Sequence, residues 1–326
     1  MKAWLLLVVL GAVSGPCCLA QDASTGLPDS YEELETVIIT GERPGPALWK
    51  VRHKEHTLWI LPTYGPLPQE LVWRSGQLEA VVRDSQEVYF LTHINAPSRN
   101  VSEPALLQAF QNADGKSLRD ILPAGMHQQF TDLAQRYAGD SAVFERLRPW
   151  VATDSLRQVA MQRLKLTSER AIAVTVQEMA RKHGVKNISA RLRDPADWDR
   201  MIAELARTPR EKDIPCARAR LDRLETDLRA AVARANAWAT GDIDALRNDP
   251  NLYVEQADSE VCAQSLQQLK LANKRNLDLR RVSYTWSVRA LKKNRSTLVL
   301  VPVTSLFGAQ GLMEKFRAAG YRIEEP

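Results

Sequence analysis

The stretches Thr57-Leu58-Trp59-Ile60-Leu61-Pro62-Thr63-Tyr64-Gly65 and Thr297-Leu298-Val299-Leu300-Val301-Pro302-Val303-Thr304-Ser305 stand near opposite ends of the chain and share one layout. Each begins with apolar and β-branched residues, a composition that favours a buried strand. Each then passes through a proline into a loop that leads to a predicted helix. Because the order of strand, loop and helix is the same at both ends, we expect the two strands to lie in one sheet.

The two ends of the chain are predicted to be rich in strands. A hairpin is expected from Ala47–Val51 and Thr57–Leu61, with the polar turn Arg52–His56 between them. Apolar residues then recur at helical spacing before Glu87–Thr92, which is a third strand candidate. The closing elements are expected to be a strand, a helix and a strand: Ser296–Val303, Gly308–Ala319 and Tyr321–Ile323.

The middle of the chain, from Pro104 to Asn294, is dominated by helical signals. The predicted helices are Leu118–Leu122, Met126–Ala138, Asp140–Trp150, Ala171–His183, Cys216–Trp238 and Val261–Leu291. We therefore expect an α/β (α+β) fold in which a central mixed sheet is built from N-terminal and C-terminal strands and has a large helical middle. Residues 47–326 are predicted to form one domain, since a chain of this length can bury one large core.

The first twenty residues have the layout of a secretory signal. Lys2 is followed by the apolar run Ala3–Val13 and by a segment of small and turn-prone residues that ends at Ala20. The run is shorter than the roughly 20 residues that a bilayer span requires, and we expect no transmembrane segment. The sequence predicts export to the periplasm. A lipid anchor on Cys17 or Cys18 is the less favoured interpretation, because the preceding residues lack the expected leucine.

Residues 21–46 are rich in Asp, Glu, Ser, Gly and Pro, which predicts an extended leader. Within it, Leu34-Glu35-Thr36-Val37-Ile38-Ile39-Thr40-Gly41 resembles the start of the plug of TonB-dependent receptors, where such a strand can pair with a partner's sheet edge. An ordinary strand or linker is the favoured interpretation, because no β sequence long enough for a barrel follows.

The cysteines predict a covalent cross-link, and the charge distribution limits the kinds of partner. After signal removal, Cys216 and Cys262 are the remaining cysteines, and in an oxidising compartment they predict a disulfide, with two buried thiols as the alternative. Such a bridge would contribute roughly 3 to 4 kcal/mol through loop closure.

The formal net charge is +5, and cationic residues alternate with acidic ones without a concentrated basic run. Nucleic acid is therefore not an expected partner.

Several separated pieces of the sequence resemble one family. They are Leu48–Val51, His56–Leu61, Arg148-Pro149-Trp150, Trp238-Ala239-Thr240-Gly241-Asp242, Arg275-Asn276, Leu306, Gly308, Gly311-Leu312 and Gly320-Tyr321-Arg322-Ile323. In order and spacing they resemble the TraB/GumN family, the bacterial relatives of the Tiki-type metalloproteases. The resemblance implies the fold of that family, a bacterial source and an ancestral metal-dependent protease site.

The chain departs from the resemblance at the ligand positions of that site. The two Gly-x-x-His motifs of the family correspond here to Pro62-x-x-Gly65 and Pro302-x-x-Ser305, and the strand-end glutamate falls at about Leu91. Acidic positions of the helical middle fall near Ala173 and Arg191. A glycine, a leucine and a hydroxyl are no ligand set for a divalent ion. We therefore predict no catalytic residue, no metal and no cofactor.

Polar residues near the two motifs are still expected to line a cleft at the strand ends, where open α/β sheets bind ligands. The candidates are Thr63, Tyr64, Thr304, Ser305, Arg275, Asn276 and His93. Arg275 suits a carboxylate or phosphate, or else it bonds loop carbonyls. His93 is the best substitute metal ligand, although a surface or capping histidine is the favoured interpretation.

The other histidines are not expected to form a metal site. His53 and His56 should point in different directions, and His127 and His183 should be exposed on helices. The sequence thus favours an exported pseudoenzyme that binds a peptide or an envelope protein. Two alternatives stay open: a metal-dependent peptidase with relocated ligands such as His93, and an envelope interaction protein that uses the strand Leu34–Gly41. The oligomeric state is not predicted.

Overall fold

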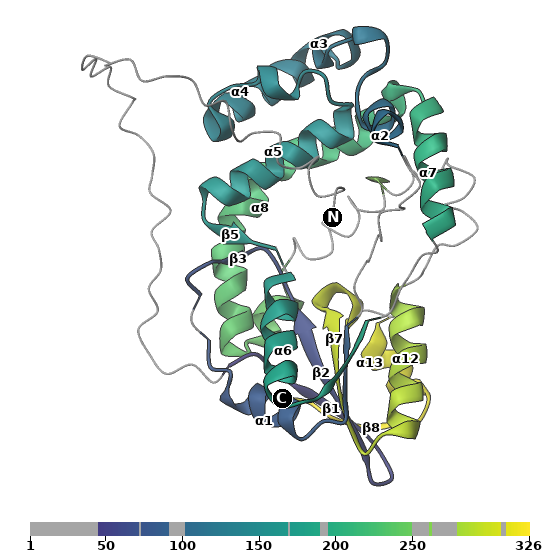
Figure 1. Cartoon of the computed structure of the whole chain (residues 1–326). Helices are drawn as coiled ribbons and strands as arrows, with labels where there is room; N and C mark the ends of the chain where they lie inside the picture. The colour runs from purple at the N-terminus through teal and green to yellow at the C-terminus, as the bar shows by residue number, and fades with distance from the viewer. Residues whose placement is uncertain are drawn as a thin grey trace. The chain divides into compact units, whose positions relative to one another are not determined.

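The computed structural model describes residues 45–71, 73–90, 102–168, 170–189, 195–249, 261–262, 279–307 and 311–326 (Figure 1). The chain divides into two units, Met1–Thr40 and Gly41–Pro326, and all described residues belong to the second. The predicted signal and the strand Leu34–Gly41 lie outside the described residues. Among those that are described, no helix combines the length and the apolar character that crossing a bilayer requires.

A mixed sheet has the strand order β6-β4-β7-β2-β1-β8. Its strands are β1 Trp49–His53, β2 His56–Thr63, β4 Glu87–Phe90, β6 Lys186–Ser189, β7 Ser296–Pro302 and β8 Arg322–Glu324. The strand β7 runs parallel to both β2 and β4, and β6 runs parallel to β4, whereas β1 is antiparallel to β2 and β8. Strands from both ends of the chain thus share one sheet, as the sequence predicts, and the C-terminal strand β7 lies between the N-terminal strands β4 and β2.

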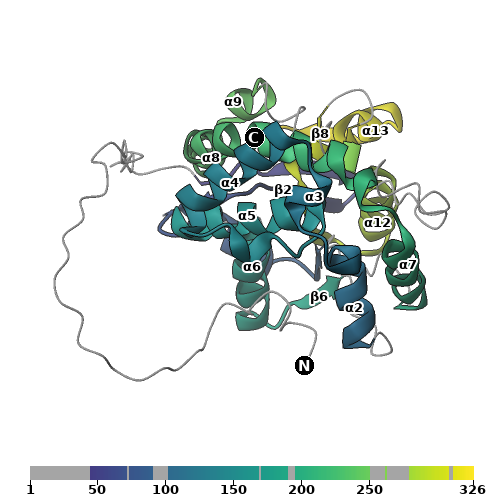
Figure 2. The ribbon, with the colours of Figure 1, turned by 90° about the horizontal axis from the view of Figure 1, so that it is seen from above.

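The central strand β7 explains why this order is stable. Its residues Thr297–Val301 are all buried, a continuous pattern typical of a parallel strand that is covered on both faces. The helices α1 Gly76–Arg83, α6 Arg170–Lys182, α12 Leu279–Lys293 and α13 Leu312–Ala318 flank the sheet. Figures 1 and 2 both show α6 and α12 on opposite sides of it. One buried hydrophobic cluster joins these helices to the strands.

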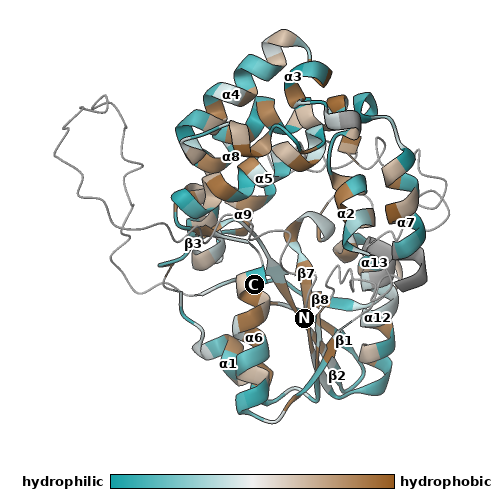
Figure 3. Cartoon of the chain, turned by 45° about the horizontal axis from the view of Figure 1, so that its top comes forward, coloured by the Kyte–Doolittle hydropathy of each residue, from teal (hydrophilic) through white to brown (hydrophobic). Residues whose placement is uncertain are grey.

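The helical middle has a hydrophobic core of its own. Four helices build it: α3 Leu118–Ile121, α4 Ala124–Ala138, α5 Pro149–Arg163 and α8 Ile214–Thr240. Hydrophobic and hydrophilic residues alternate along these helices (Figure 3), which is the pattern of amphipathic packing. A third, small cluster lies where α2 Glu103–Phe110 packs against α7 Pro195–Arg207. The α/β fold with a large helical middle is therefore confirmed.

One predicted helix is wrong. The segment Asp140–Trp150 holds only a 3₁₀ turn, Ala142–Phe144, and α5 begins at Pro149. Arg148 is extended, with φ −64° and ψ 152°, because a residue before proline is pushed out of the helical region. Proline then suits the first helical position. Of the predicted helix Val261–Leu291, the part from residue 263 to 278 lies outside the described residues.

The arginine of the Arg-Pro-Trp element forms a buried ion pair within the helical middle. The Arg148 guanidinium is fully buried and lies 2.6 and 2.8 Å from the carboxylate oxygens of Asp213. Its Nη1 also donates to the carbonyls of Ala109 and Leu205. Burial raises the pKa of Asp213, while the hydrogen bonds and charge of Arg148 oppose that rise. Arg148 thus joins α2, α5 and α7 to the start of α8.

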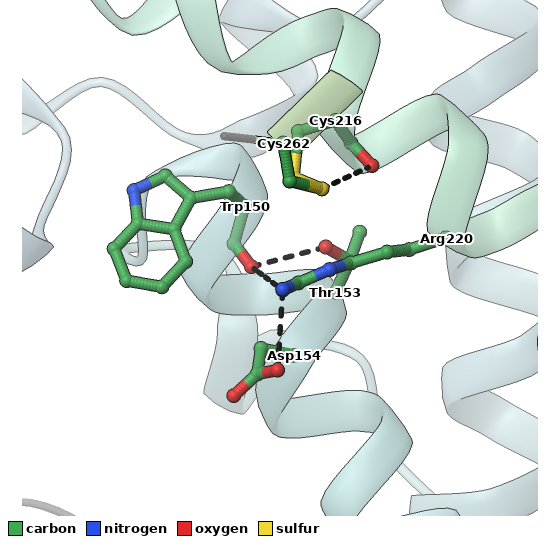
Figure 4. The surroundings of a disulfide bond; sticks show 6 residues. All are labelled: Trp150, Thr153, Asp154, Cys216, Arg220 and Cys262. Carbon is green, nitrogen blue, oxygen red and sulfur yellow. Dashed lines mark hydrogen bonds and ion pairs between the residues drawn. A yellow bond between two sulfur atoms is a disulfide. The ribbon is translucent and has the colours of Figure 1, made fainter. Parts of the chain in front are cut away.

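The predicted disulfide between Cys216 and Cys262 is present, with an S–S distance of 2.06 Å (Figure 4). Cys216 lies in the first turn of α8. One turn further on, the Arg220 guanidinium donates to the Trp150 carbonyl at 3.3 Å and to the Asp154 carboxylate at 3.1 Å. The start of α8 is therefore fixed to α5 on one side and to Cys262 on the other.

Candidate functional site

The ends of β2 and β7 bring the two motif segments together. In their parallel register Thr63 pairs with Pro302, so the residues that follow leave the sheet side by side. We call Thr63, Tyr64, Gly65, Thr304 and Ser305 the carboxyl edge. The other predicted cleft residues, Arg275, Asn276 and His93, lie outside the described residues, as does Leu91.

The side chains of the carboxyl edge are largely covered. Thr63, Tyr64 and Ser305 are 7, 3 and 5 % exposed, whereas Gly65 and Thr304 are half-buried. What this edge offers to solvent is therefore mainly the backbone of the two loops and the Thr304 side chain. A ligand here would meet peptide groups and hydroxyls rather than charges.

Trp238 supports the first motif from the helical middle. Its indole Nε1 donates to the Pro62 carbonyl at 2.8 Å, across 176 residues of sequence. The ring is fully buried and packs edge-on against Trp73, with 5.2 Å between ring centres. Because a buried carbonyl without a donor is costly, this bond fixes the strand end that precedes Gly65.

The rest of the Trp-x-x-Gly-Asp element has local structural roles. Gly241 ends α8 in the left-handed conformation with φ 71°, and a Cβ there would lie 3.1 Å from the Gly45 carbonyl oxygen. The Asp242 carboxylate accepts the Ala245 N–H at 2.9 Å and caps α9, Ile243–Arg247. The chain can therefore turn sharply between α8 and α9, beside Gly45, which precedes the first strand of the sheet.

A buried ion pair lies next to Tyr64. The Arg234 guanidinium stands 5.7 Å from the centre of the Tyr64 ring, and its Nε lies 3.2 Å from an Asp249 carboxylate oxygen. Its Nη2 also donates to the Asp227 carbonyl at 3.1 Å. The two charges neutralise each other, so this pair stabilises the packing around Tyr64 without adding a net charge to the edge.

The loop of the second motif is closely packed. Val303–Ser305 forms a 3₁₀ turn, and the Leu306 carbonyl accepts the Met313 N–H at 3.3 Å. A Cβ on Gly311 would lie 2.4 Å from that same carbonyl oxygen, so only glycine fits there. The Phe307 ring packs edge-on against Trp49, with 6.0 Å between ring centres. The C-terminal loop is therefore fixed by close backbone contact.

The loop of the first motif is held by a second, small sheet. The peptide bond between Gly65 and Pro66 is cis, and the chain then enters β3, Leu67–Pro68. This strand pairs with β5, Leu166–Thr167, and the Thr167 hydroxyl donates to the Leu67 carbonyl at 3.1 Å. Neither strand of this sheet is predicted from the sequence, since two residues are too short for a periodic pattern.

A comparison with protein families now decides the assignment. The model of the TraB/PrgY/gumN family matches residues 47–325. The chain belongs to this family. No curated protein and no solved structure matches it. Within the TraB/PrgY/gumN fold, the resembling pieces around Trp238 and Gly311 support the two motif segments, as described above.

The described residues do not fit the metal that the family resemblance implies. Gly65 has no side chain, Ser305 offers a buried hydroxyl, and the weakly aligned acidic position at Ala173 is a buried alanine of α6. No group of three or more His, Cys, Asp or Glu side chains that could hold a metal ion occurs in the described part of the chain. A protease metal takes several imidazole or carboxylate ligands, and this edge supplies hydroxyls and carbonyls instead.

The described histidines are engaged elsewhere, and two expectations about them are wrong. His127 and His183 are half-buried rather than exposed, because their Nε2 atoms bond Glu145 and Glu79 at 2.8 and 2.9 Å. His53 and His56 are register partners across the β1–β2 hairpin and therefore share a face of the sheet.

The hairpin histidines nevertheless have separate contacts. The His53 ring packs against Tyr321, with 5.5 Å between ring centres, and His56 Nδ1 lies 2.8 Å from the Leu291 carbonyl. The His56 contact therefore docks α12 against the hairpin, and the His53 contact docks the C-terminal segment.

Proposed function

We propose that this protein is a catalytically inactive member of the TraB/PrgY/gumN family that binds a peptide, or an extended segment of an envelope protein, at the carboxyl edge. The observation that supports this is the pairing of Thr63 with Pro302, which keeps the two motif segments adjacent. The family resemblance assigns ligand positions to Gly65 and Ser305, which carry no metal-ligating side chain. The fold of the site is retained, and the groups that would activate water are replaced.

The chemistry of the edge suits a peptide. Its hydroxyls and loop backbone are neutral donors and acceptors, and the neighbouring charges of Arg234 and Asp249 are paired with each other. An extended peptide presents the same kinds of groups, and the carboxyl ends of parallel strands are the usual ligand-binding end of such sheets. A highly charged small molecule would find no complementary charge in the described part of the edge.

Export to the periplasm is part of the proposal and rests on the signal-like residues 1–20. It is tested by attaching residues 1–20 to a reporter that is active only after export. We expect the reporter to be active in the periplasm and to lose its activity when Leu5, Leu6 and Leu7 are replaced by charged residues.

Binding is tested with the signal-free protein and a pool of fluorescein-labelled, unstructured peptides followed by fluorescence polarisation. We expect saturable binding without cleavage. Thr304→Arg, which places a long side chain at the half-buried position of the edge, should weaken binding at least about tenfold, equivalent to 1.4 kcal/mol. Asn187→Arg, at an exposed position of β6, is the matched control and should bind like the wild type.

The same assay distinguishes the alternatives. Peptide cleavage that a chelator stops, and that His93→Ala abolishes, would establish a relocated metal site and overturn the pseudoenzyme proposal. A second outcome would be that the Thr304→Arg variant binds peptide as the wild type does, while deletion of residues 34–41 abolishes binding. That result would assign peptide binding to the leader strand instead of the carboxyl edge.

A further inference from the structure

Cationic side chains gather at the end of the sheet that lies opposite the carboxyl edge. Register pairs Thr57 with Ser296, and it pairs Glu87 with both Thr297 and Lys186, so the amino ends of β2, β7, β4 and β6 are neighbours. The β1–β2 turn lies at this end, and α1, α6 and α12 each lead into it, at the lower end of the sheet in Figure 1.

Nine exposed cationic residues of the described part of the chain lie along this end, and we call them the amino-edge patch: Arg52, Lys54, Arg83, Lys182, Lys186, Lys292, Lys293, Arg295 and Arg322. Among the residues that the structure describes, five carboxylates accompany them: Glu55, Glu79, Asp84, Glu87 and Glu324. The excess positive charge at this one end is therefore close to the formal net charge of +5 for the whole chain.

A buried carboxylate organises the centre of the patch. Glu87 is 5 % exposed and lies 2.9 Å from the Lys293 ammonium and 3.4 Å from that of Lys186. Tyr89 and Asn294 also donate to it, at 2.8 and 2.7 Å. Burial raises the pKa of Glu87, but these hydrogen bonds together outweigh it and lower the pKa to about 2. Glu87 therefore stays ionised and holds two lysines from separate segments side by side.

In the described part of the chain, three of the other members of the patch have no carboxylate partner, whereas four do. Arg52 and Arg322 pair with Glu324, Arg83 pairs with Asp84, and Lys182 pairs with Glu79. Within the described residues, Lys54, Lys292 and Arg295 make no ion pair, and all three are exposed. These three charges are the ones most available to an external partner.

Helix ends account for only part of the patch. Arg83, Lys182, Lys292 and Lys293 stand in the last turns of α1, α6 and α12, where cations balance the helix dipole. The remaining members lie on strands or in turns, so the dipole gives no reason for them. Their side chains add charge beyond what the helices require.

We propose that the amino-edge patch docks the protein on an anionic phospholipid surface. Polybasic surfaces are attracted to anionic headgroups in proportion to the number of cations near the membrane. No large hydrophobic side chain among the described residues of this end is exposed, so the contact is electrostatic and reversible, without an inserted anchor. The same lack of exposed aromatic rings argues against single-stranded nucleic acid, which binds by base stacking.

The proposal goes beyond the proposed function, because it orients the molecule. With the amino edge on the membrane, the carboxyl edge at the opposite ends of β2 and β7 would face away from the lipid and remain open to a peptide. Lipid binding and peptide binding use different ends of the sheet. Either can therefore fail in experiment without the other.

The test is co-sedimentation of the signal-free protein, residues 21–326, with vesicles of phosphatidylcholine alone or mixed with phosphatidylglycerol. We expect binding only to the anionic vesicles and its release at about 0.5 M salt, where charges are screened within a few ångströms. The triple variant Lys54→Glu, Lys292→Glu and Arg295→Glu should weaken binding more than tenfold. Thr304→Arg should bind the vesicles like the wild type.

A matched control separates the patch from net charge. Arg119→Glu, Arg200→Glu and Arg207→Glu change the charge equally at exposed positions of the helical middle and should retain binding. Equal loss in both triple variants, or binding that withstands the salt, would overturn the proposal. So would preferential capture of RNA over the anionic vesicles at the same salt concentration. Thermal unfolding of each variant checks that the fold is intact.

Discussion

The two ends of one sheet differ sharply in their chemistry although the same strands build both. At the carboxyl ends of β2 and β7, the side chains are small, neutral and mostly buried, as Ser305 illustrates. At the amino ends of the same strands, cations such as Lys54 and Arg295 are exposed, and Lys293 pairs with the buried carboxylate of Glu87. Strand order thus decides which segments meet, whereas the side chains at each end decide what can be bound there.

Each end is also fixed by one buried polar contact between segments that are distant in sequence. Trp238 holds the Pro62 carbonyl at the carboxyl edge, and Glu87 holds Asn294 and two lysines at the amino edge. The first contact is neutral and should be insensitive to pH. The second is ionic and should fail in acid.

Trp238→Ala should have the largest effect. Loss of a fully buried tryptophan costs about 3–5 kcal/mol of unfolding free energy. Trp238→Phe keeps most of the apolar volume but leaves the Pro62 carbonyl unpaired, at a cost of about 1–3 kcal/mol. Urea unfolding measures both. Trp286→Phe, at a half-buried ring that packs on Tyr89, is the control, and a cost equal to that of Trp238→Phe would refute a special role for the Pro62 bond.

Glu87→Gln should destabilise the protein by up to about 3 kcal/mol at pH 7, since its pKa is about 2 when folded and 4.5 in its ordinary state. Because the folded pKa is the lower one, this stabilisation is complete above pH 4.5 and disappears as the pH falls toward 2. The wild type should therefore lose stability in that window, and Glu87→Gln should lose much less. Acid titration of the urea midpoint measures this difference.

The control for the acid titration is Glu79→Gln, which removes a more exposed carboxylate paired with Lys182 and His183. Solvent screens this pair, so the substitution should leave most of the acid sensitivity in place. If Glu79→Gln flattened the profile as much as Glu87→Gln, the acid sensitivity would not originate in the buried cluster.

The smallest changes in unfolding free energy are expected at two glycines that each end a helix, and these two positions are closely matched. Gly184, after α6 on the amino side, has φ 67° and open space around a Cβ, so Gly184→Ala should cost about 1–2 kcal/mol from backbone strain alone. Gly241 has φ 71° and faces the Gly45 carbonyl oxygen. Gly241→Ala should therefore cost about 1 kcal/mol more through overpacking. Equal costs in chemical unfolding would contradict the close contact.

The sequence predicted those parts of the fold that have strong periodicity. The hairpin and β7 were expected to within two residues, because their apolar runs are long and buried. The strand β6 was missed, since an edge strand with sequence Lys-Asn-Ile-Ser has only one half-buried apolar residue. The predicted helix Asp140–Trp150 is wrong because Pro149 holds Arg148 in an extended conformation, and this outweighs the helical spacing of the apolar residues.

The candidate site was predictable only in part. The layout around Pro62 and Pro302 and the family resemblance predicted that the motif segments meet, and the register confirms it. The bond from Trp238 was not foreseen, because no local pattern links an indole to a carbonyl 176 residues away. The amino-edge patch was missed for the same reason, since its cations come from short segments that only the folded sheet brings together.

The central claim, that the carboxyl edge is a binding site without a metal, is tested most directly by thermal-shift titration of the signal-free protein with Mn²⁺, Co²⁺ and Zn²⁺. A native metal site must stabilise the fold by mass action as the ion concentration passes its dissociation constant. We predict no saturable rise in Tm with any of the three ions. A saturable rise at micromolar metal that His93→Ala abolishes would contradict the account and establish a relocated metal site.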